Sequence, residues 1–124
     1  MIRRLPLVVL LLTMVSFGAG FDGAWLKKVP VQERQKANPY ENQPEAVDSG
    51  RQVFRQHCSR CHGESAEGNK KHPPLVSPRI QRQATPGELH YLLANGSMAK
   101  GMPPWSKLGD PQIWQLVSYL KSLP

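Results

Sequence analysis

The residues with the clearest capacity for chemistry form the run Cys58-Ser59-Arg60-Cys61-His62. Two thiols separated by two residues, with an imidazole directly after the second, form the C-x-x-C-H pattern by which c-type haem is attached. At this spacing both sulfurs fit one helical turn and can reach the two vinyl groups on one edge of a porphyrin. His62 then lies under the ring, where its imidazole can bind the iron as the proximal ligand. The run therefore predicts one covalently bound haem c per chain.

Three other chemistries of a C-x-x-C pair fit the sequence less well. A structural zinc site normally takes four protein ligands, whereas this chain has two cysteines and its other histidines show no ligand spacing. A thioredoxin-like redox pair belongs to a βαβ unit, and nothing around Cys58 predicts one. A disulfide across two intervening residues would constrain very little of the unfolded chain. Haem attachment is the favoured interpretation.

A second iron ligand is predicted within residues 96–105, which contain two methionines. Pro103 restricts Met102 to extended backbone angles and stiffens the loop, and Gly101 permits a close approach to a macrocycle. Met98 follows the end of a predicted helix and has no glycine directly before it or proline directly after it. Met102 is therefore the preferred thioether ligand and Met98 the alternative. The sequence is also compatible with histidine ligation, with an open distal site, or with a methionine that only fills a gap beside an aromatic ring.

Two helices are predicted on either side of the loop that follows the attachment run. Three apolar or small residues precede Cys58 at helical spacing, which predicts a first helix from Ala46 onward. They are Val47, Gly50 and Phe54. The run Thr85-Pro86-Gly87-Glu88 is a capping box with proline at the first helical position, and it predicts a second, short helix. His90 falls on the face of that helix away from its leucines, so we predict that it is exposed and is not an iron ligand.

A further helix is predicted at the end of the sequence. Asp110 offers an N-cap, and Pro111 suits the first helical position. Apolar residues then recur on one face as far as the chain end. They are Ile113, Leu116, Val117 and Leu120.

With these residues in view, the chain resembles the class I c-type cytochrome family, and in particular the bacterial cytochrome c domains of its oxidase-associated branch. In that family the first and last helices cross at a glycine, against which an aromatic residue of the other helix packs. Gly50 and Phe54 precede the attachment run at the family's spacing, and Leu116 and Tyr119 match the paired positions of the last helix. The resemblance implies a cytochrome c domain over residues 45–124. Its fold would be all-α, with three to five short helices wrapped around the haem and crossed N- and C-terminal helices.

The resemblance also assigns residues around the haem. A metal-bound histidine usually donates its other ring N–H to a nearby acceptor. In the family this acceptor is a proline carbonyl in a Pro-x-Leu segment, and the leucine packs against the porphyrin. Pro73 and Leu75 match this spacing, with Pro74 as the alternative. The family also shows a Met-Pro pair at its distal ligand, as Met102 and Pro103 do here.

Residues 1–20 have the composition of a secretory signal. Arg3 and Arg4 precede an apolar run, and small residues follow it. The run contains Pro6 and is shorter than the roughly 20 residues of a spanning helix, but its cleavage signal is imperfect. We therefore expect either a signal peptide or an N-terminal membrane anchor that could tether the protein. Both would place the rest of the chain in the periplasm or on the outer face of the cytoplasmic membrane.

Residues 21–44 are rich in proline, asparagine and glutamine, which predicts an extended linker without regular structure. Trp25-Leu26 and Val29-Pro30-Val31 supply its apolar groups. The simpler interpretation is a tether, or a strap lying on the surface of the domain. The alternative is a docking tail for a partner or a membrane face.

The 124-residue chain has a formal net charge of +7. Its basic residues are scattered and no nucleic-acid-binding motif is present, so nucleic acid is not an expected partner. Some basic residues flank the predicted ligand loops and would steer an acidic redox partner if they surround the haem edge. They are Lys70, Lys71, Arg79, Arg82, Lys100 and Lys107.

Two axial ligands from the protein would leave no open position on the iron, so one-electron exchange is the chemistry that remains. We predict an exported monohaem cytochrome c that carries electrons between redox partner proteins, acidic or membrane-bound, and that is not an enzyme. A first alternative is the subunit through which electrons enter a larger membrane or periplasmic oxidoreductase complex. A second is a ligand-binding or peroxidatic haem protein with an open distal site.

Overall fold

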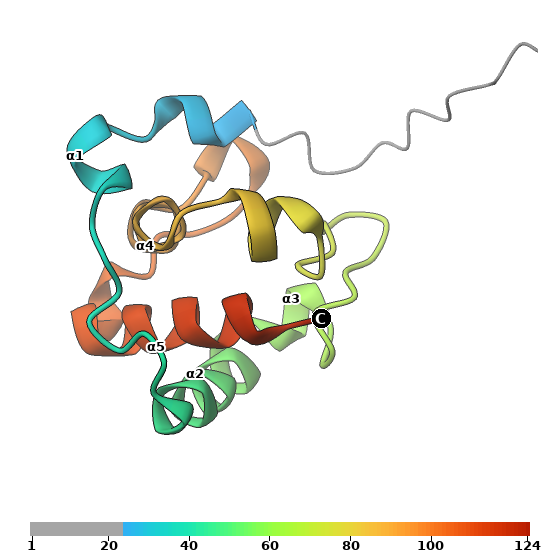
Figure 1. The fold of residues 1–124 in the computed structure, drawn as a ribbon. Helices are drawn as coiled ribbons and strands as arrows, with labels where there is room; N and C mark the ends of the chain where they lie inside the picture. The colour runs from blue at the N-terminus through green and yellow to red at the C-terminus, as the bar shows by residue number, and fades with distance from the viewer. Residues whose placement is uncertain (1–23) are drawn as a thin grey trace, which may run out of the picture.

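The computed structural model describes residues 24–124, and over that range the chain folds into helices (Figure 1). Three longer helices form its body: α2 (Pro44–His57), α4 (Pro86–Asn95) and α5 (Asp110–Ser122). The shorter elements are η1 (Ala24–Lys28), α1 (Val31–Arg34), α3 (Ser59–His62), η2 (Arg79–Gln83), η3 (Met98–Lys100) and η4 (Ser106–Leu108). Within the described range the only strand-like pairing is an isolated bridge between Ser97 and Met102. The predicted all-α fold class is confirmed.

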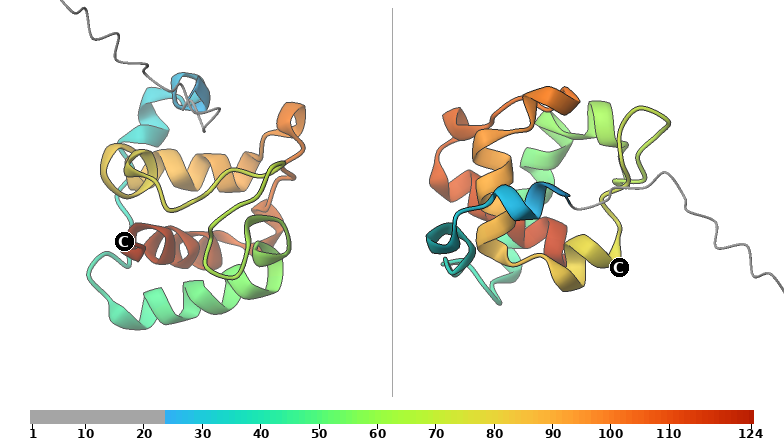
Figure 2. Two further views of the ribbon diagram at one scale, coloured as in Figure 1. Left: turned by 90° about the vertical axis from the view of Figure 1, so that its right-hand side faces the viewer. Right: turned by 90° about the horizontal axis from the view of Figure 1, so that it is seen from above.

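The helices α2 and α5 cross at Gly50, as the sequence predicts. They lie side by side in the left view of Figure 2, and a Cβ atom at Gly50 would lie 2.0 Å from the carbonyl oxygen of Gln115. Beside this contact the rings of Phe54 and Tyr119 pack with their centroids 5.2 Å apart. A glycine is needed here because the two backbones approach too closely for any side chain.

The hydrophobic core lies between α2, α4 and α5. Its most completely buried large side chains are Phe54, Leu89, Ile113, Leu116 and Val117. Burying one such side chain contributes roughly 1.5–3 kcal/mol. The apolar faces predicted for the first and last helices therefore meet in one core.

The helix α4 starts with the predicted capping box. The Thr85 hydroxyl accepts the backbone N–H of Glu88 at 3.1 Å, and the Glu88 carboxylate accepts the backbone N–H of Thr85 at 2.8 Å. At the last helix the prediction is one residue off, because Gly109 occupies the N-cap position and Asp110 is the first helical residue.

The prediction that His90 is exposed is wrong. Its exposed fraction is 7 %, because the start of α5 covers the face of α4 opposite the leucines. The His90 ring stacks on Trp114 with centroids 4.2 Å apart, and its Nε2 atom lies 3.2 Å from the carboxylate of Asp110. His90 lies outside the cavity described below.

The segment 21–44, predicted to be an extended linker or docking tail, is folded over its described part. We name residues 24–43 the N-terminal strap; it contains η1 and α1 and lies across α4 (Figures 1 and 2). Val29 is buried in it, and the buried Asn38 side chain donates a hydrogen bond to Ser118 of α5 at 2.8 Å. A few buried side chains hold this otherwise polar segment on the domain surface, where one of the interpretations of the sequence placed a strap, and its two short helices were not predicted.

The predicted signal peptide or anchor, residues 1–20, lies outside the described residues. Within the described range the longest helix is α2, with 14 residues, against about 20 for a membrane span. No helix there has both the length and the hydropathy that a membrane crossing requires.

Candidate haem site

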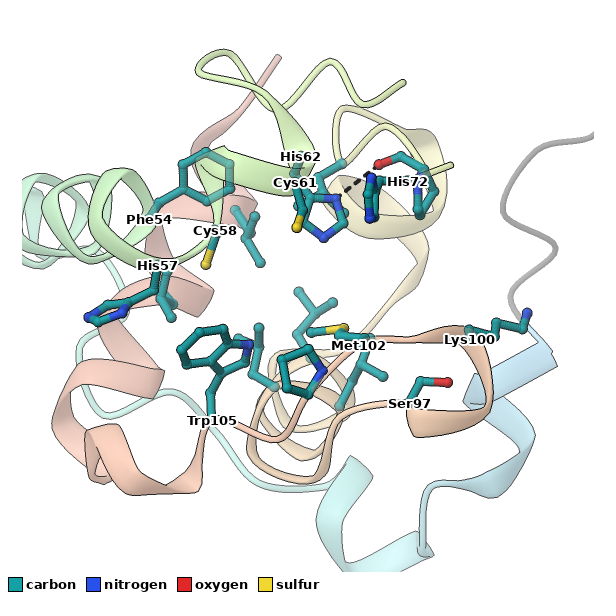
Figure 3. A pocket seen from close by; sticks show the side chains of 18 of the residues that line it. Phe54, His57, Cys58, Cys61, His62, His72, Ser97, Lys100, Met102 and Trp105 are labelled. Atoms are coloured by element: carbon teal, nitrogen blue, oxygen red, sulfur yellow. Dashed lines mark hydrogen bonds between the residues drawn. The ribbon is translucent and has the colours of Figure 1, made fainter. Parts of the chain in front are cut away.

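The domain contains an apolar cavity between α2 and α3 on one side and α4 with the loop after it on the other (Figure 3). Its volume is about 1220 Å³ when the space at its open mouth is included. The aliphatic and aromatic part of the lining is formed chiefly by Phe54, Leu75, Ile80, Leu89, Leu92, Leu93, Leu116 and Leu120.

The attachment run forms one wall of this cavity. Helix α2 ends at His57, and the backbone N–H of His62 donates to the carbonyl of Cys58 at 3.0 Å, which closes the single turn of α3. Cys58 and Cys61 both line the cavity as free thiols. Burial, together with the neighbouring Cys61, raises the pKa of Cys58 to about 12. The predicted helical turn therefore presents both sulfurs and the imidazole to one space.

The imidazole of His62 is fixed in orientation by Pro73. The Nδ1 atom lies 3.1 Å from the Pro73 carbonyl oxygen, and because that oxygen can only accept, Nδ1 carries the hydrogen and Nε2 keeps its lone pair. Burial lowers the pKa of His62; the Pro73 contact opposes this shift and the nearby His72 adds to it. His62 is therefore held in the neutral form that can bind a metal through Nε2.

The loop that carries the proline carbonyl is itself anchored. The backbone N–H of Leu75 donates to Ala66 at 2.8 Å, and that of Gly68 donates to His62 at 2.7 Å. Leu75 lines the cavity, as the resemblance implied. Of the two candidate prolines, Pro73 makes the contact with the imidazole.

Met102 faces His62 across the cavity. Figure 3 shows the two side chains directed into the cavity from opposite sides. Met102 and Ser97 exchange backbone hydrogen bonds of 2.9 and 3.0 Å, which close a small hairpin around η3. Gly101 in this hairpin has φ +81° and nothing within 4 Å of its Cβ position. Met98 lies at the tip of the same hairpin, 71 % exposed and off the cavity lining.

Several cavity residues were not identified from the sequence as site residues. His57 and Trp105 line the cavity with ring centroids 5.3 Å apart, and Trp25 reaches it from the N-terminal strap. The signal for Trp25 was its position as a large apolar residue in a polar segment. Among the six basic residues proposed to surround the haem edge, Lys71 and Lys100 line the cavity.

These residues fit a c-type haem. An apolar space has an imidazole nitrogen on one side, a thioether sulfur on the other and two thiols on its wall, which is the donor set of a covalently attached, six-coordinate haem. Within residues 24–124 no three His, Cys, Asp or Glu side chains gather closely enough to hold a metal ion by themselves. The cavity therefore matches a porphyrin better than a structural zinc ion.

Residues 45–120 match the family described as "Cytochrome C oxidase, cbb3-type, subunit III", which is more than half of the chain. The chain belongs to this family. Two curated relatives are similar to this chain. The cbb3-type cytochrome c oxidase subunit FixP of Sinorhizobium medicae (strain WSM419) is 34% identical over 85 residues, covering 66% of this chain and 29% of that protein. Subunit CcoP of Azospirillum brasilense is 34% identical over 85 residues, covering 63% and 28%.

Two solved structures similar to this chain are c-type cytochromes. Cytochrome cL from Methylophaga aminisulfidivorans has a TM-score of 0.51 and 27% identity, covering 68% of this chain and 59% of that one. The KustC0563 c-type cytochrome has a TM-score of 0.53 and covers 60% of this chain and 95% of its own, and at 18% identity it shows the shared fold. As a cytochrome c domain of electron transport, this family member carries covalent haem c.

Proposed function

We propose that this chain is the electron-transfer domain through which single electrons enter a membrane-bound oxidase of the cbb3 type. The observation that carries the proposal is the placement of His62 and Met102 on opposite sides of one apolar cavity. Haem bound there supplies a one-electron iron couple, and thioether ligation raises its reduction potential.

Each site residue has a defined part in this proposal. Cys58 and Cys61 would hold the porphyrin through thioether bonds, and His62 would bind the iron through Nε2. Pro73 fixes the tautomer and orientation of His62 through its carbonyl oxygen. Met102 would supply the second protein ligand of the iron. With His62 and Met102 both bound to the iron, no position would remain for a substrate, so the domain would transfer electrons and would not itself be an enzyme.

The partner assignment is supported by the relatives, which are named as oxidase subunits. This chain spans less than a third of their length, so only the cytochrome c part is shared. These relatives favour the first alternative over a freely diffusing carrier. We place the domain on the periplasmic side of the membrane, where the sequence of residues 1–20 would direct it, with other oxidase subunits or redox proteins as partners.

The Met102→Ala variant tests the distal ligand. We expect the reduction potential of the holoprotein to fall by on the order of 0.1 V or more, within the roughly 0.8 V range that axial ligands span. The sulfur-to-iron charge-transfer band of the ferric protein should disappear, and carbon monoxide should bind the reduced variant rapidly. Spectroelectrochemistry and absorption spectra measure these changes.

Met98→Ala is the matched control, because Met98 lies on the same hairpin but is 71 % exposed. Its potential and charge-transfer band should equal those of the unmodified protein. A band that survives in Met102→Ala and vanishes in Met98→Ala would assign the ligand to Met98. Rapid carbon monoxide binding by the unmodified protein would favour the open-site alternative instead.

The assignment to an oxidase is tested by isolating the protein from native membranes under mild detergent. The proposal predicts that the haem-stained chain migrates with the oxidase activity and that an antibody against it removes that activity from the extract. A chain recovered wholly as a free, soluble species would instead support the diffusing carrier.

A further inference from the structure

The N-terminal strap contributes a wall to the haem cavity. Trp25 of η1 lines the cavity and packs, with Leu26, against the hydrophobic core, although both precede the matched residues 45–120. We propose that Trp25 is a haem-contacting residue that shields the haem, and that Arg34 is the residue that positions it. This inference rests on the haem site of the proposed function.

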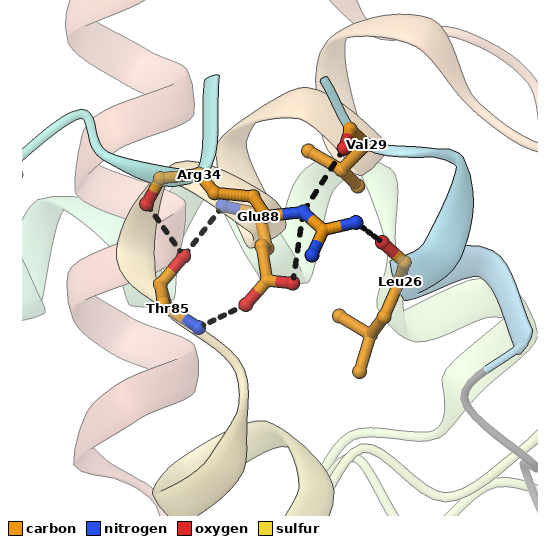
Figure 4. A network of polar contacts seen from close by, with 5 residues as sticks. All are labelled: Leu26, Val29, Arg34, Thr85 and Glu88. Carbon is orange, nitrogen blue, oxygen red and sulfur yellow. Dashed lines mark hydrogen bonds and ion pairs between the residues drawn. The ribbon is translucent and has the colours of Figure 1, made fainter. Parts of the chain in front are cut away.

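Arg34 holds η1 to α1 through two different nitrogen atoms (Figure 4). Its Nε donates to the carbonyl of Val29 at 3.0 Å, and its Nη2 donates to the carbonyl of Leu26 at 2.9 Å. A guanidinium presents these donors in a rigid plane, so both carbonyls are fixed at once. The Leu26 carbonyl directly follows Trp25 in the chain. The two hydrogen bonds of the Arg34 guanidinium therefore restrain the backbone that carries the Trp25 side chain.

The strap is also tied to the start of α4. The Thr85 hydroxyl donates to the carbonyl of Arg34 at 3.0 Å, and the Glu88 carboxylate lies 4.0 Å from the Arg34 Nε. At Gly87 a Cβ atom would lie 2.0 Å from the carbonyl oxygen of Glu33, so the backbones of α1 and α4 are in direct contact. The other end of α4 leads into the Met102 hairpin, so one helix supports both the strap and the distal ligand.

An indole at this position would change the environment of the iron in two ways. It excludes water from part of the haem, and a drier surrounding disfavours the ferric state, which carries one more positive charge than the ferrous state. It also closes part of the path by which a small ligand reaches the iron. Removing Trp25 should therefore lower the reduction potential and speed the binding of an added ligand.

The experiment uses the full-length holoprotein and three variants of the strap. Imidazole binds the ferric iron only when the bond to the Met102 sulfur breaks, and this exchange is followed by the absorption spectrum. The reduction potential is measured in the same samples. Trp25→Ala should bind imidazole faster by about threefold or more and have a lower potential, since solvent exposure of the haem is one determinant of both. Arg34→Ala should shift both quantities in the same direction. Val31→Ala is the control, because Val31 is on the same strap, 60 % exposed and off the cavity lining.

Two conservative variants separate these roles from general stability. Trp25→Phe keeps an apolar ring and should stay close to the unmodified protein, and it remains informative if Trp25→Ala fails to fold. Arg34→Lys keeps the charge near Glu88 but lacks the rigid plane with two separated nitrogen donors, so it should resemble Arg34→Ala. An Arg34→Lys variant identical to the unmodified protein would overturn the positioning role.

The outcomes also distinguish this inference from the function on which it rests. A holoprotein that lacks covalent haem would overturn both. A protein with covalent haem and Met102 ligation, in which Trp25→Ala equals Val31→Ala in both measurements, would overturn only the role of Trp25.

Discussion

The Gly50→Ala variant is expected to lose about 3 kcal/mol or more of the free energy of unfolding, at the upper end of what overpacking costs. On intrinsic propensity alone, alanine would stabilise a helix interior by about 1 kcal/mol. Here the added Cβ would lie 2.0 Å from the oxygen and 2.6 Å from the carbon of the Gln115 carbonyl. Both atoms belong to the backbone of α5 and cannot rotate away, so the two helices must separate. The steric clash therefore outweighs the gain in helix propensity, and the variant is less stable than the unmodified protein.

Guanidinium unfolding of the holoprotein, followed by far-UV circular dichroism, measures this change. A loss of this size corresponds to a fall in melting temperature of about 12 °C or more for a domain of this length. Gln52→Ala is the control, because Gln52 is exposed on the same helix, and its stability should change by no more than about 0.5 kcal/mol. If Gly50→Ala proved as stable as Gln52→Ala, the close crossing of α2 and α5 would be incorrect.

Replacing both Cys58 and Cys61 by alanine is expected to abolish covalent haem attachment completely. The thioether bonds need a sulfur at each position, and the other described side chains of the cavity offer no further thiol. The red, haem-stained band of the unmodified protein on a denaturing gel should be absent from the double variant. Each single variant should keep a weaker band through its one thioether.

Ser59→Ala is the control for this experiment. Ser59 lies between the two cysteines, and its hydroxyl donates to the backbone of Arg55 at 2.8 Å and not into the cavity. Haem attachment should be unchanged in this variant. Pigment that survives denaturation in the double alanine variant would disprove attachment through Cys58 and Cys61.

The parts of the fold that the sequence predicted correctly depend on short-range patterns. The capping box at Thr85 and the helical spacing from Gly50 to Cys58 involve residues one or two turns apart, so their geometry follows from local chemistry. The position of His62 also follows from local sequence, because it comes directly after Cys61 in the attachment run. Its partner Pro73 was inferred from a family resemblance, and the 3.1 Å contact agrees with that assignment.

The features that the sequence did not predict depend on contacts between distant residues. His90 is buried because the start of α5, about twenty residues later, covers it. The strap is folded because the Asn38 side chain binds Ser118, which is 80 residues away. In addition, the Arg34 side chain donates hydrogen bonds to two backbone carbonyls of the strap that would otherwise bind water. No pattern within a polar, proline-rich segment specifies such partners.

The course of the strap bears on how the domain would be oriented at a membrane. Because Trp25 lines the cavity, any anchor or further domain joined ahead of residue 24 would be connected next to the cavity and not at its remote side. Such an attachment would bring the cavity nearer to the tethered surface than an attachment on the remote side of the domain would. The distance between the haem site and a redox partner in that surface would then be set by the attachment. The rate of electron transfer would depend less on diffusion of the two proteins toward each other.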